Sequence, residues 1–255
     1  MTTERTPLIV GNWKMNKVGS EATDLAGQIA VGANGLQVEV AVCPPSIYLE
    51  AVANILSAST VAVGGQDCRA ESSGAHTGDV SAAMIADVGC RYVIAGHSER
   101  RTDHGEDDAM VKAKAEAAQR ADLTAIICVG ESQDERDQGL TLARISAQLE
   151  SSIPKSADAA NTVVAYEPIW AIGSGRTPTL EEVQGVHSHI RTYLGITHTA
   201  DVAEQMRVLY GGSVKPENAS ELSALADVDG ALVGGASLDA ETFLAIAWAS
   251  SNAMD

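Results

Sequence analysis

The stretch that decides the fold is Thr162-Val163-Val164-Ala165-Tyr166-Glu167-Pro168-Ile169-Trp170-Ala171-Ile172-Gly173. Its first four residues are short, apolar and rich in β-branched side chains, which predicts a buried strand. A strand that is apolar on both faces suits a parallel sheet covered by helices on each side. Glu167 should therefore stand at the carboxyl end of a parallel strand.

Similar short apolar runs recur along the whole chain, and segments with helical character separate them. Eight strands alternating with helices in about 250 residues predict a (β/α)₈ TIM barrel, with a doubly wound open sheet as the alternative fold. The eight runs are residues 8–10, 38–42, 61–63, 92–95, 125–129, 162–165, 208–210 and 231–233.

The segments between the runs carry helix signals. Residues 109–120 and 140–152 have helical patterns, and a capping box at Thr179 and Glu182 predicts the start of another helix. No linker or low-complexity tract divides the chain. We therefore expect residues 1–255 to form a single barrel domain.

The composition limits the partners of the chain. With 255 residues, 45% of them hydrophobic, the chain can bury a large core. A formal charge of −17 argues against nucleic acid and anionic membranes as partners, because both would be repelled. An anionic substrate would need local positive potential from a lysine or from backbone N–H groups.

We expect a cytoplasmic protein. No apolar run approaches the roughly 20 residues of a membrane span, and residues 1–7 lack a signal-peptide pattern. The cysteines are widely spaced, which predicts reduced and mostly structural thiols and leaves the roles of Cys68 and Cys90 open. They are Cys43, Cys68, Cys90 and Cys128.

Polar and glycine-rich signatures follow the predicted strands rather than the helices. In a barrel these positions share one rim, where active sites of this fold are built. We therefore expect residues far apart in the sequence to converge there. The signatures are Asn12 and Lys14, His97, Glu167, Gly211-Gly212-Ser213, and Gly234-Gly235.

Glu167 and the segment after it resemble a base beside a lid. The residues from Ile169 to Ile172 are apolar, Pro168 stiffens one end, and Gly173 frees the other. Such a segment can close and exclude water, which helps a carboxylate take a proton from a weak carbon acid. In isolation, the motif could also be a helix cap or surface ion pair at Glu167 with core packing at Trp170.

The other rim residues suggest complementary roles. Lys14 would be a cation and Asn12 an amide donor in a pocket, although a lysine at a strand end is more often a solvated charge. His97 precedes an apparent helix start, which disfavours an imidazolium, so we expect a neutral hydrogen-bond donor. A buried histidine satisfied by backbone groups is the simpler alternative.

We predict no metal site. His187 and His189 are two residues apart, and residues at that spacing on a helix do not face each other. We expect this pair to lie on the surface.

The glycine-rich turns after the last two strands predict a phosphate site. Glycine lets backbone N–H groups approach an oxyanion closely, although a lone Gly-Gly pair is usually only a tight turn. Ser213, Gly234 and Gly235, with Gly173 from the lid, could together hold a phosphate. The substrate would then be a small phosphate ester that carries a carbonyl.

At this point the sequence closely resembles the triosephosphate isomerase family over essentially its whole length. Several specific motifs occur in the family's order. They are Gly11-Asn12-Trp13-Lys14-Met15-Asn16, Ala95-Gly96-His97-Ser98-Glu99-Arg100-Arg101, Cys128-Val129-Gly130-Glu131, Ala165-Tyr166-Glu167-Pro168-Ile169-Trp170-Ala171-Ile172-Gly173, Tyr210-Gly211-Gly212-Ser213-Val214 and Val233-Gly234-Gly235-Ala236-Ser237-Leu238.

The resemblance implies a glycolytic and gluconeogenic isomerase without a cofactor. It would interconvert dihydroxyacetone phosphate and glyceraldehyde 3-phosphate through an enediolate. Glu167 would move the proton, His97 and Lys14 would stabilise the oxyanion, and Asn12 would orient the substrate. Glu99 and Cys128 match family positions beside these residues. Gly173, Ser213, Gly234 and Gly235 would bind the phosphate.

The resemblance also implies a homodimer built on the loop from Gly74 to Ser81. The chain departs mildly from the family at Asp79, where glutamate is frequent, and at Ser174 and Arg176 of the lid, where threonine and lysine are common. Two other functions remain open on the same scaffold. One is an isomerase of a four-carbon ketose phosphate, and the other is a non-catalytic phosphosugar-binding protein.

Overall fold

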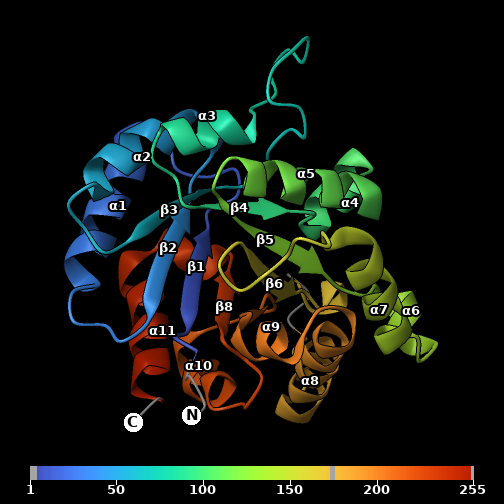
Figure 1. Cartoon of the computed structure of the whole chain (residues 1–255). Coiled ribbons are helices and arrows are strands. Elements are labelled where there is room, and N and C mark those ends of the chain that lie inside the picture. Colours follow the sequence, from blue (N-terminus) through green and yellow to red (C-terminus); the bar gives the residue numbers. More distant parts are fainter. Residues whose placement is uncertain (1–4, 173–175, 254–255) are drawn as a thin grey trace.

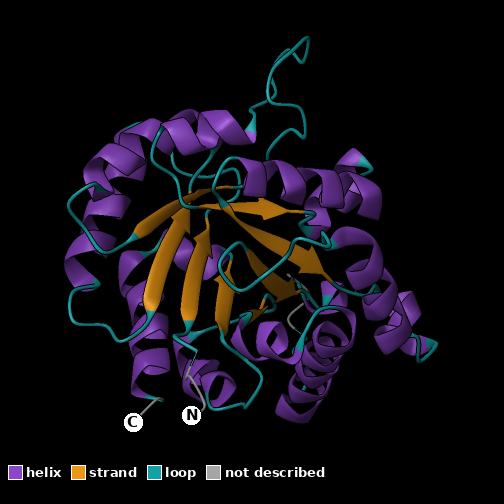
Figure 2. Cartoon of the chain, in the orientation of Figure 1, coloured by secondary structure: helices purple, strands orange, loops and turns teal. Residues whose placement is uncertain are grey.

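Eight parallel strands close into a barrel in the computed structural model, which describes residues 5–172 and 176–253. The strands pair in sequence order, and helices surround them on the outside (Figures 1 and 2). β1 pairs with β8 through Leu8 opposite Gly230 and Val10 opposite Leu232, which closes the sheet on itself. The predicted TIM barrel is therefore confirmed, and the doubly wound open sheet is excluded.

All eight predicted strands are present, and only their ends differ from the predicted runs. Their bounds are β1 Leu8–Asn12, β2 Glu39–Cys43, β3 Ala62–Gly65, β4 Tyr92–Ala95, β5 Thr124–Val129, β6 Thr162–Tyr166, β7 Val208–Tyr210 and β8 Gly230–Val233.

The helices follow the strands, as the alternating pattern predicted. The α-helices are α1 Ser20–Gly32, α2 Leu49–Leu56, α3 Ala82–Asp87, α4 Ser98–His104, α5 Asp108–Arg120, α6 Gln133–Asp137, α7 Thr141–Ser152, α8 Leu180–Thr197, α9 Ala200–Gln205, α10 Pro216–Ser223 and α11 Ala240–Asn252. Three short 3₁₀ turns are η1 Ser46–Tyr48, η2 Ile169–Ala171 and η3 Gly235–Leu238.

Local sequence signals explain where the longest helix begins. The Thr179 hydroxyl accepts a hydrogen bond from the Glu182 N–H, and the Glu182 carboxylate accepts one from the Thr179 N–H. This is the predicted capping box, and it satisfies two N–H groups at the start of α8. Among the described residues, no helix is both long and apolar enough to cross a membrane.

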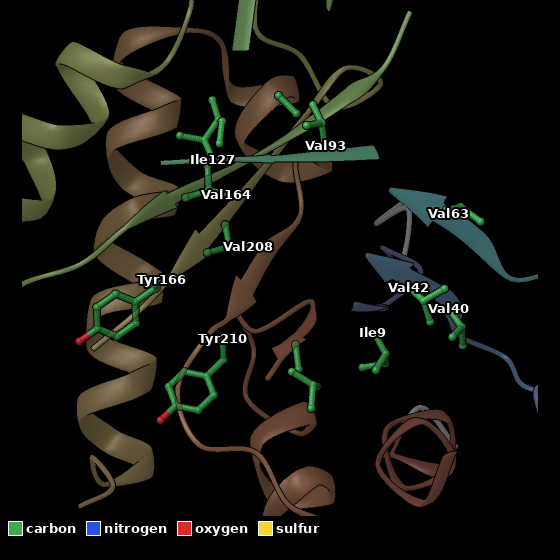
Figure 3. Packing of buried hydrophobic residues seen from close by; sticks show 14 of the residues in the cluster. Ile9, Val40, Val42, Val63, Val93, Ile127, Val164, Tyr166, Val208 and Tyr210 are labelled. Atoms are coloured by element: carbon green, nitrogen blue, oxygen red, sulfur yellow. The ribbon is translucent and has the colours of Figure 1, made fainter. Parts of the chain in front are cut away.

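The strands are apolar on both faces because the barrel has two separate cores. Leu8 and Val10 of β1 point inward with alternate residues of the other strands and fill the barrel. Ile9 points the other way and belongs to the larger layer between strands and helices. Figure 3 shows this outer layer, in which Val164, Tyr166 and Val208 come from neighbouring strands.

The prediction that His187 lies on the surface is wrong, because its side chain is fully buried. On α8 it shares the inward face with Val183, Val186, Ile190 and Leu194, and its ring meets the ring of Tyr166 edge to face. The spacing of two from His189 was used only to argue that the two rings do not face each other. This spacing did not indicate which of the two histidines faces the barrel.

Burial gives His187 a strong pH dependence. Loss of hydration lowers the pKa of His187 to about 4, although the Asp227 carbonyl contacts Nδ1 at 3.1 Å. The unfolded chain, with a pKa near 6.5, binds the proton more readily. The free energy of unfolding therefore keeps its full value above pH ~6.5 as far as His187 is concerned. It decreases by roughly 3 kcal/mol as the pH falls towards ~4.

We predict that His187→Asn removes this part of the acid sensitivity. Asparagine cannot take up the proton, so the unfolding free energy of the variant should fall less than that of the parent between pH 6.5 and 4. The difference between the two proteins should therefore shrink over this range. Denaturant unfolding at fixed protein concentration measures it. His189→Asn on the same helix is the control and should leave the pH slope unchanged. Equal slopes for the parent and His187→Asn would contradict the prediction.

Candidate active site

A cavity of about 320 Å³ lies at the carboxyl edge of the barrel. Side chains and glycines from the ends of five strands line it, which is what the parallel arrangement predicts for this edge. The structure thus brings together seven of the residues singled out from the sequence. They are Asn12, Lys14, His97, Glu167, Ser213, Gly234 and Gly235. The eighth, Gly173, lies outside the described residues.

Glu167 follows β6 directly and is only 2% exposed. Its N–H donates to the Val129 carbonyl at 2.8 Å, which keeps the residue in line with β5. On the other side, a Cβ added to Gly211 would lie 2.8 Å from Glu167 Cγ, so no larger residue fits there without displacing the side chain. The carboxylate is therefore confined by its neighbours.

His97, which follows β4, contacts this carboxylate directly. Its Nε2 lies 2.9 Å from Glu167 Oε1, and the Ser98 N–H donates to Glu167 Oε2 at 2.9 Å. His97 Nδ1 accepts a hydrogen bond from the Glu99 N–H at 3.2 Å, as the cap of α4. An accepting Nδ1 carries no proton, which places the proton of the neutral ring on Nε2.

The two groups shift each other's pKa. Burial alone would lower the pKa of His97, but the charge and hydrogen bond of Glu167 outweigh it, so the net direction is upward. Burial alone would raise the pKa of Glu167, but His97, the Ser98 N–H and Lys14 together lower it. The helix start at Ser98 therefore does not decide the pKa of His97 as the sequence suggested, because the contact with Glu167 acts in the opposite direction.

Lys14 adopts a backbone conformation that few non-glycine residues adopt. Its φ is 51°, in the left-handed region, and its N–H donates to Asn12 Oδ1 at 3.1 Å. Gln66 Nε2 donates to the Lys14 carbonyl at 2.8 Å, which holds the turn from the far side. Lys14 Nζ is 2.5 Å from Glu99 Oε1. Strain of this kind is concentrated at functional sites.

The glycine-rich end of the cavity is held by a side chain that the sequence did not single out. Asn218 of α10 donates from Nδ2 to the Ser213 carbonyl at 3.1 Å and accepts the Lys215 N–H at 2.8 Å. The turn between Ser213 and Lys215 is therefore clamped at both ends. Gly234 and Gly235 lie on the same cavity, and a Cβ added to Gly234 would lie 3.5 Å from Lys14 Cε.

The apolar segment after Glu167 is anchored to a buried carboxylate. Glu131 Oε1 accepts hydrogen bonds from Trp170 Nε1 at 2.8 Å and from the Tyr166 hydroxyl at 3.1 Å. Burial raises the pKa of Glu131. The Arg136 guanidinium of α6 lies 3.8 Å from the centre of the Trp170 ring. Neither Glu131 nor Arg136 was assigned a role from the sequence, because nothing local marks either residue as a partner of Trp170.

The cavity combines a confined carboxylate, an imidazole, an ammonium group and glycine-rich turns. Such a set can move a proton at carbon and stabilise a developing oxyanion. Across residues 5–172 and 176–253, no group of three or more His, Cys, Asp or Glu side chains could hold a metal ion.

Comparisons with known proteins agree with this geometry. The family model described as triosephosphate isomerase matches residues 7–250. Triosephosphate isomerase of Afipia carboxidovorans is 55% identical, with 94% of this chain and 96% of that protein covered. That of Bradyrhizobium sp. (strain ORS 278) is 54% identical, with 97% and 99% covered. The crystal structure of triosephosphate isomerase from Bartonella henselae has a TM-score of 0.88 and 44% identity, and covers 94% of this chain and 97% of that one.

The geometry predicts how the pKa of His97 depends on Glu167. Glu167→Gln keeps a similar shape and an acceptor oxygen but removes the charge, so burial should dominate and the pKa of His97 should fall. NMR titration of ¹⁵N-labelled histidine measures this, and it should also show an unprotonated Nδ1 in the neutral ring. Glu99→Gln is the matched control, because Glu99 Oε2 is farther from the ring, at 3.8 Å from Nδ1, and should have a smaller effect. A His97 pKa that is unaltered in Glu167→Gln would contradict the assigned contact.

Proposed function

The chain belongs to the triosephosphate isomerase family and interconverts dihydroxyacetone phosphate and glyceraldehyde 3-phosphate, and we propose that the cavity around Glu167 and His97 performs this reaction. The observation that carries the proposal is the buried contact between Glu167 and His97 in a cavity that glycine-rich turns also line. A role in glycolysis follows from the reaction.

In the proposed mechanism, Glu167 acts as the base. Its carboxylate removes the proton from C1 of dihydroxyacetone phosphate, and the electron pair of the C–H bond forms a C1–C2 double bond while the C2 oxygen becomes negative. A proton passes from the C1 hydroxyl to the C2 oxygen. Protonated Glu167 then returns its proton to C2, and C1 becomes the aldehyde carbon.

His97 and Lys14 would stabilise the negative oxygen of the enediolate. A neutral imidazole with its proton on Nε2 can donate to that oxygen, and this nitrogen now faces Glu167 Oε1 at 2.9 Å. The substrate oxygen would replace the carboxylate as the acceptor, which frees Glu167 to approach carbon. Asn12 would orient the substrate from the end of β1, where its side chain is buried.

The phosphate would bind at the glycine-rich end of the same cavity. The N–H groups of Ser213, Gly234 and Gly235 are proposed as donors, together with Gly173 from the lid. The clamp by Asn218 supports this arrangement, because backbone donors bind an anion best when they are fixed beforehand. The apolar segment after Pro168 would cover the substrate and exclude water.

The other two functions are not favoured. The relatives with 51–55% identity are named triosephosphate isomerase, which favours the triose over a four-carbon ketose phosphate. A phosphosugar-binding protein would have no use for a buried carboxylate that contacts an imidazole. A cytoplasmic location stays a prediction.

The assignment of the base predicts a large loss of turnover when the carboxylate moves. Glu167→Asp withdraws it by about 1 Å, which should lower kcat with dihydroxyacetone phosphate on the order of 10²-fold. Gly211→Ala keeps the Glu167 residue but should displace its side chain, because the added Cβ would lie 2.8 Å from Glu167 Cγ, and should also lower kcat. Gly185→Ala is the control, because an added Cβ there meets nothing within 4 Å. A kcat of Glu167→Asp within twofold of the parent would exclude Glu167 as the base.

The preference for the triose is tested separately, by assays of the parent with a tetrose phosphate.

We also propose a homodimer built on the loop of residues 74–81. The segment between β3 and α3 projects away from the barrel (Figure 1). Arg69 joins its two sides through Glu71 at 2.7 Å and Asp79 at 3.2 Å. A projecting loop with a defined shape is suited to insertion into a second copy.

A surface that could receive this loop lies beside it. A cavity of about 710 Å³ is lined by Lys14, Pro45 and Asp79, among others. Met15, which also lines it, is 95% exposed, and Ile47, next to the lining residue Ser46, is 80% exposed. Apolar side chains this exposed favour a protein partner. In the proposed dimer, Thr77 of one copy would approach the rim near Asn12 and Lys14 of the other.

The proposed dimer predicts that a charge at Ile47 separates the subunits. Ile47→Arg should sediment as a monomer at low protein concentration and lose specific activity, which should return as the concentration rises. Val31→Arg on α1 is the control, because Val31 is similarly exposed, at 75%, but lies away from the loop. Full specific activity in a species that sediments as a monomer would refute the dependence of the site on the dimer.

A further inference from the structure

Lys215 lies on the active-site cavity and has no assigned role. It lines the same 320 Å³ cavity as Ser213, Gly234 and Gly235. Lys14 is the other lysine on this cavity, and it is already paired with Glu99 at 2.5 Å. No arginine among the described residues lines the cavity. The positive charge of Lys215 is therefore a main contribution to the local potential at the glycine-rich end.

Among the described residues, Lys215 has no carboxylate partner, whereas the other lysine of the cavity, Lys14, has one. The sequence has 34 acidic and 17 basic residues, and most of its basic residues form ion pairs in the structure. Within the described part of the chain, Lys215 makes no ion pair, although Glu217 follows it in the first turn of α10. The charge of Lys215 is thus not neutralised by a neighbour at close range.

The backbone fixes where this side chain starts. The Lys215 N–H donates to Asn218 Oδ1 at 2.8 Å, and Pro216 is the first residue of α10. The same Asn218 side chain binds the Ser213 carbonyl, so the backbones of Lys215 and Ser213 are held in a fixed relation. An exposed lysine on a fixed backbone keeps its charge near the cavity mouth while its ammonium group stays hydrated.

We propose that Lys215 attracts the dianionic phosphate end of the substrate to the cavity and sets the affinity for it. This inference rests on the proposed function. A chain of net charge −17 repels an anionic substrate at long range, so a cation without an ion-pair partner on the cavity opposes this repulsion at the site itself. Lys215 takes no part in the proton transfer and does not contact the reacting carbons.

The expected size of the effect follows from Coulomb's law. A single charge roughly 8 Å from a dianion in water changes affinity about fivefold. Salt screens this attraction, over a Debye length of about 30 Å at 0.01 M and about 3 Å at 1 M. The contribution of Lys215 should therefore be large in dilute buffer and small in concentrated salt.

The test compares Lys215→Gln with Lys215→Arg and Lys155→Gln. Lys155→Gln makes the same change in net charge at an exposed lysine in the loop before β6, at the opposite edge of the barrel, and Lys215→Arg keeps the charge. The measurements are kcat and kcat/KM with glyceraldehyde 3-phosphate at ionic strengths from about 0.01 to 1 M. The dissociation constant of inorganic phosphate is measured separately by calorimetry.

In Lys215→Gln, kcat/KM should fall about fivefold at low salt and the dissociation constant of phosphate should rise by a similar factor. Both differences should vanish at high salt, and the kcat of Lys215→Gln should change less than twofold. Lys215→Arg and Lys155→Gln should match the parent. The proposal is overturned if Lys215→Gln behaves like Lys155→Gln, or if its loss is equal at all salt concentrations. If the parent shows no isomerase turnover, the proposed function fails, and phosphate affinity still decides the role of Lys215.

Discussion

Pairing between β1 and β8 closes the sheet and so fixes where every strand of the barrel ends. Each parallel strand exposes its hydrogen-bonding groups along two edges, and only closure satisfies both edges of all eight strands. Closure also places the eight carboxyl ends around one opening. Glu167 after β6 and His97 after β4 can meet at 2.9 Å because the barrel is closed and narrow, although they are 70 residues apart.

The active site is a place where burial and charge oppose each other. Removing Glu167 and His97 from water would favour their neutral forms, yet their mutual contact favours the charged forms of both. The pKa values of the two groups therefore depend on which chemical group occupies the cavity beside them. In the proposed mechanism, a substrate oxygen that accepts the hydrogen bond from His97 Nε2 would remove one restraint on the Glu167 carboxylate and leave it more basic. Substrate binding would in this way raise the basicity of the proposed base.

Hydrogen bonds to fixed side chains shape the loops around this pair. Asn218 clamps the turn of Ser213, Glu131 anchors Trp170, and Gln66 holds the strained turn at Lys14. In each case an amide or carboxylate side chain binds a polar group of a segment that follows a strand and holds that segment in place. The rigid strands place the loops, and these side chains decide the loop conformations.

Local patterns in the sequence were sufficient to predict the architecture and most of the candidate site residues that line the cavity. Continuous apolar runs such as residues 162–165 marked the strands, the box at Thr179 and Glu182 marked a helix start, and the polar signatures after the strands marked the rim. These signals are local, so the order of residues is enough to recognise them. Only the tertiary structure decided the contact that raises the pKa of His97, the burial of His187, and the partners of Trp170 and Ser213. Such contacts depend on the paths of separate loops over a closed barrel, and no periodic pattern within one segment records where another segment will lie.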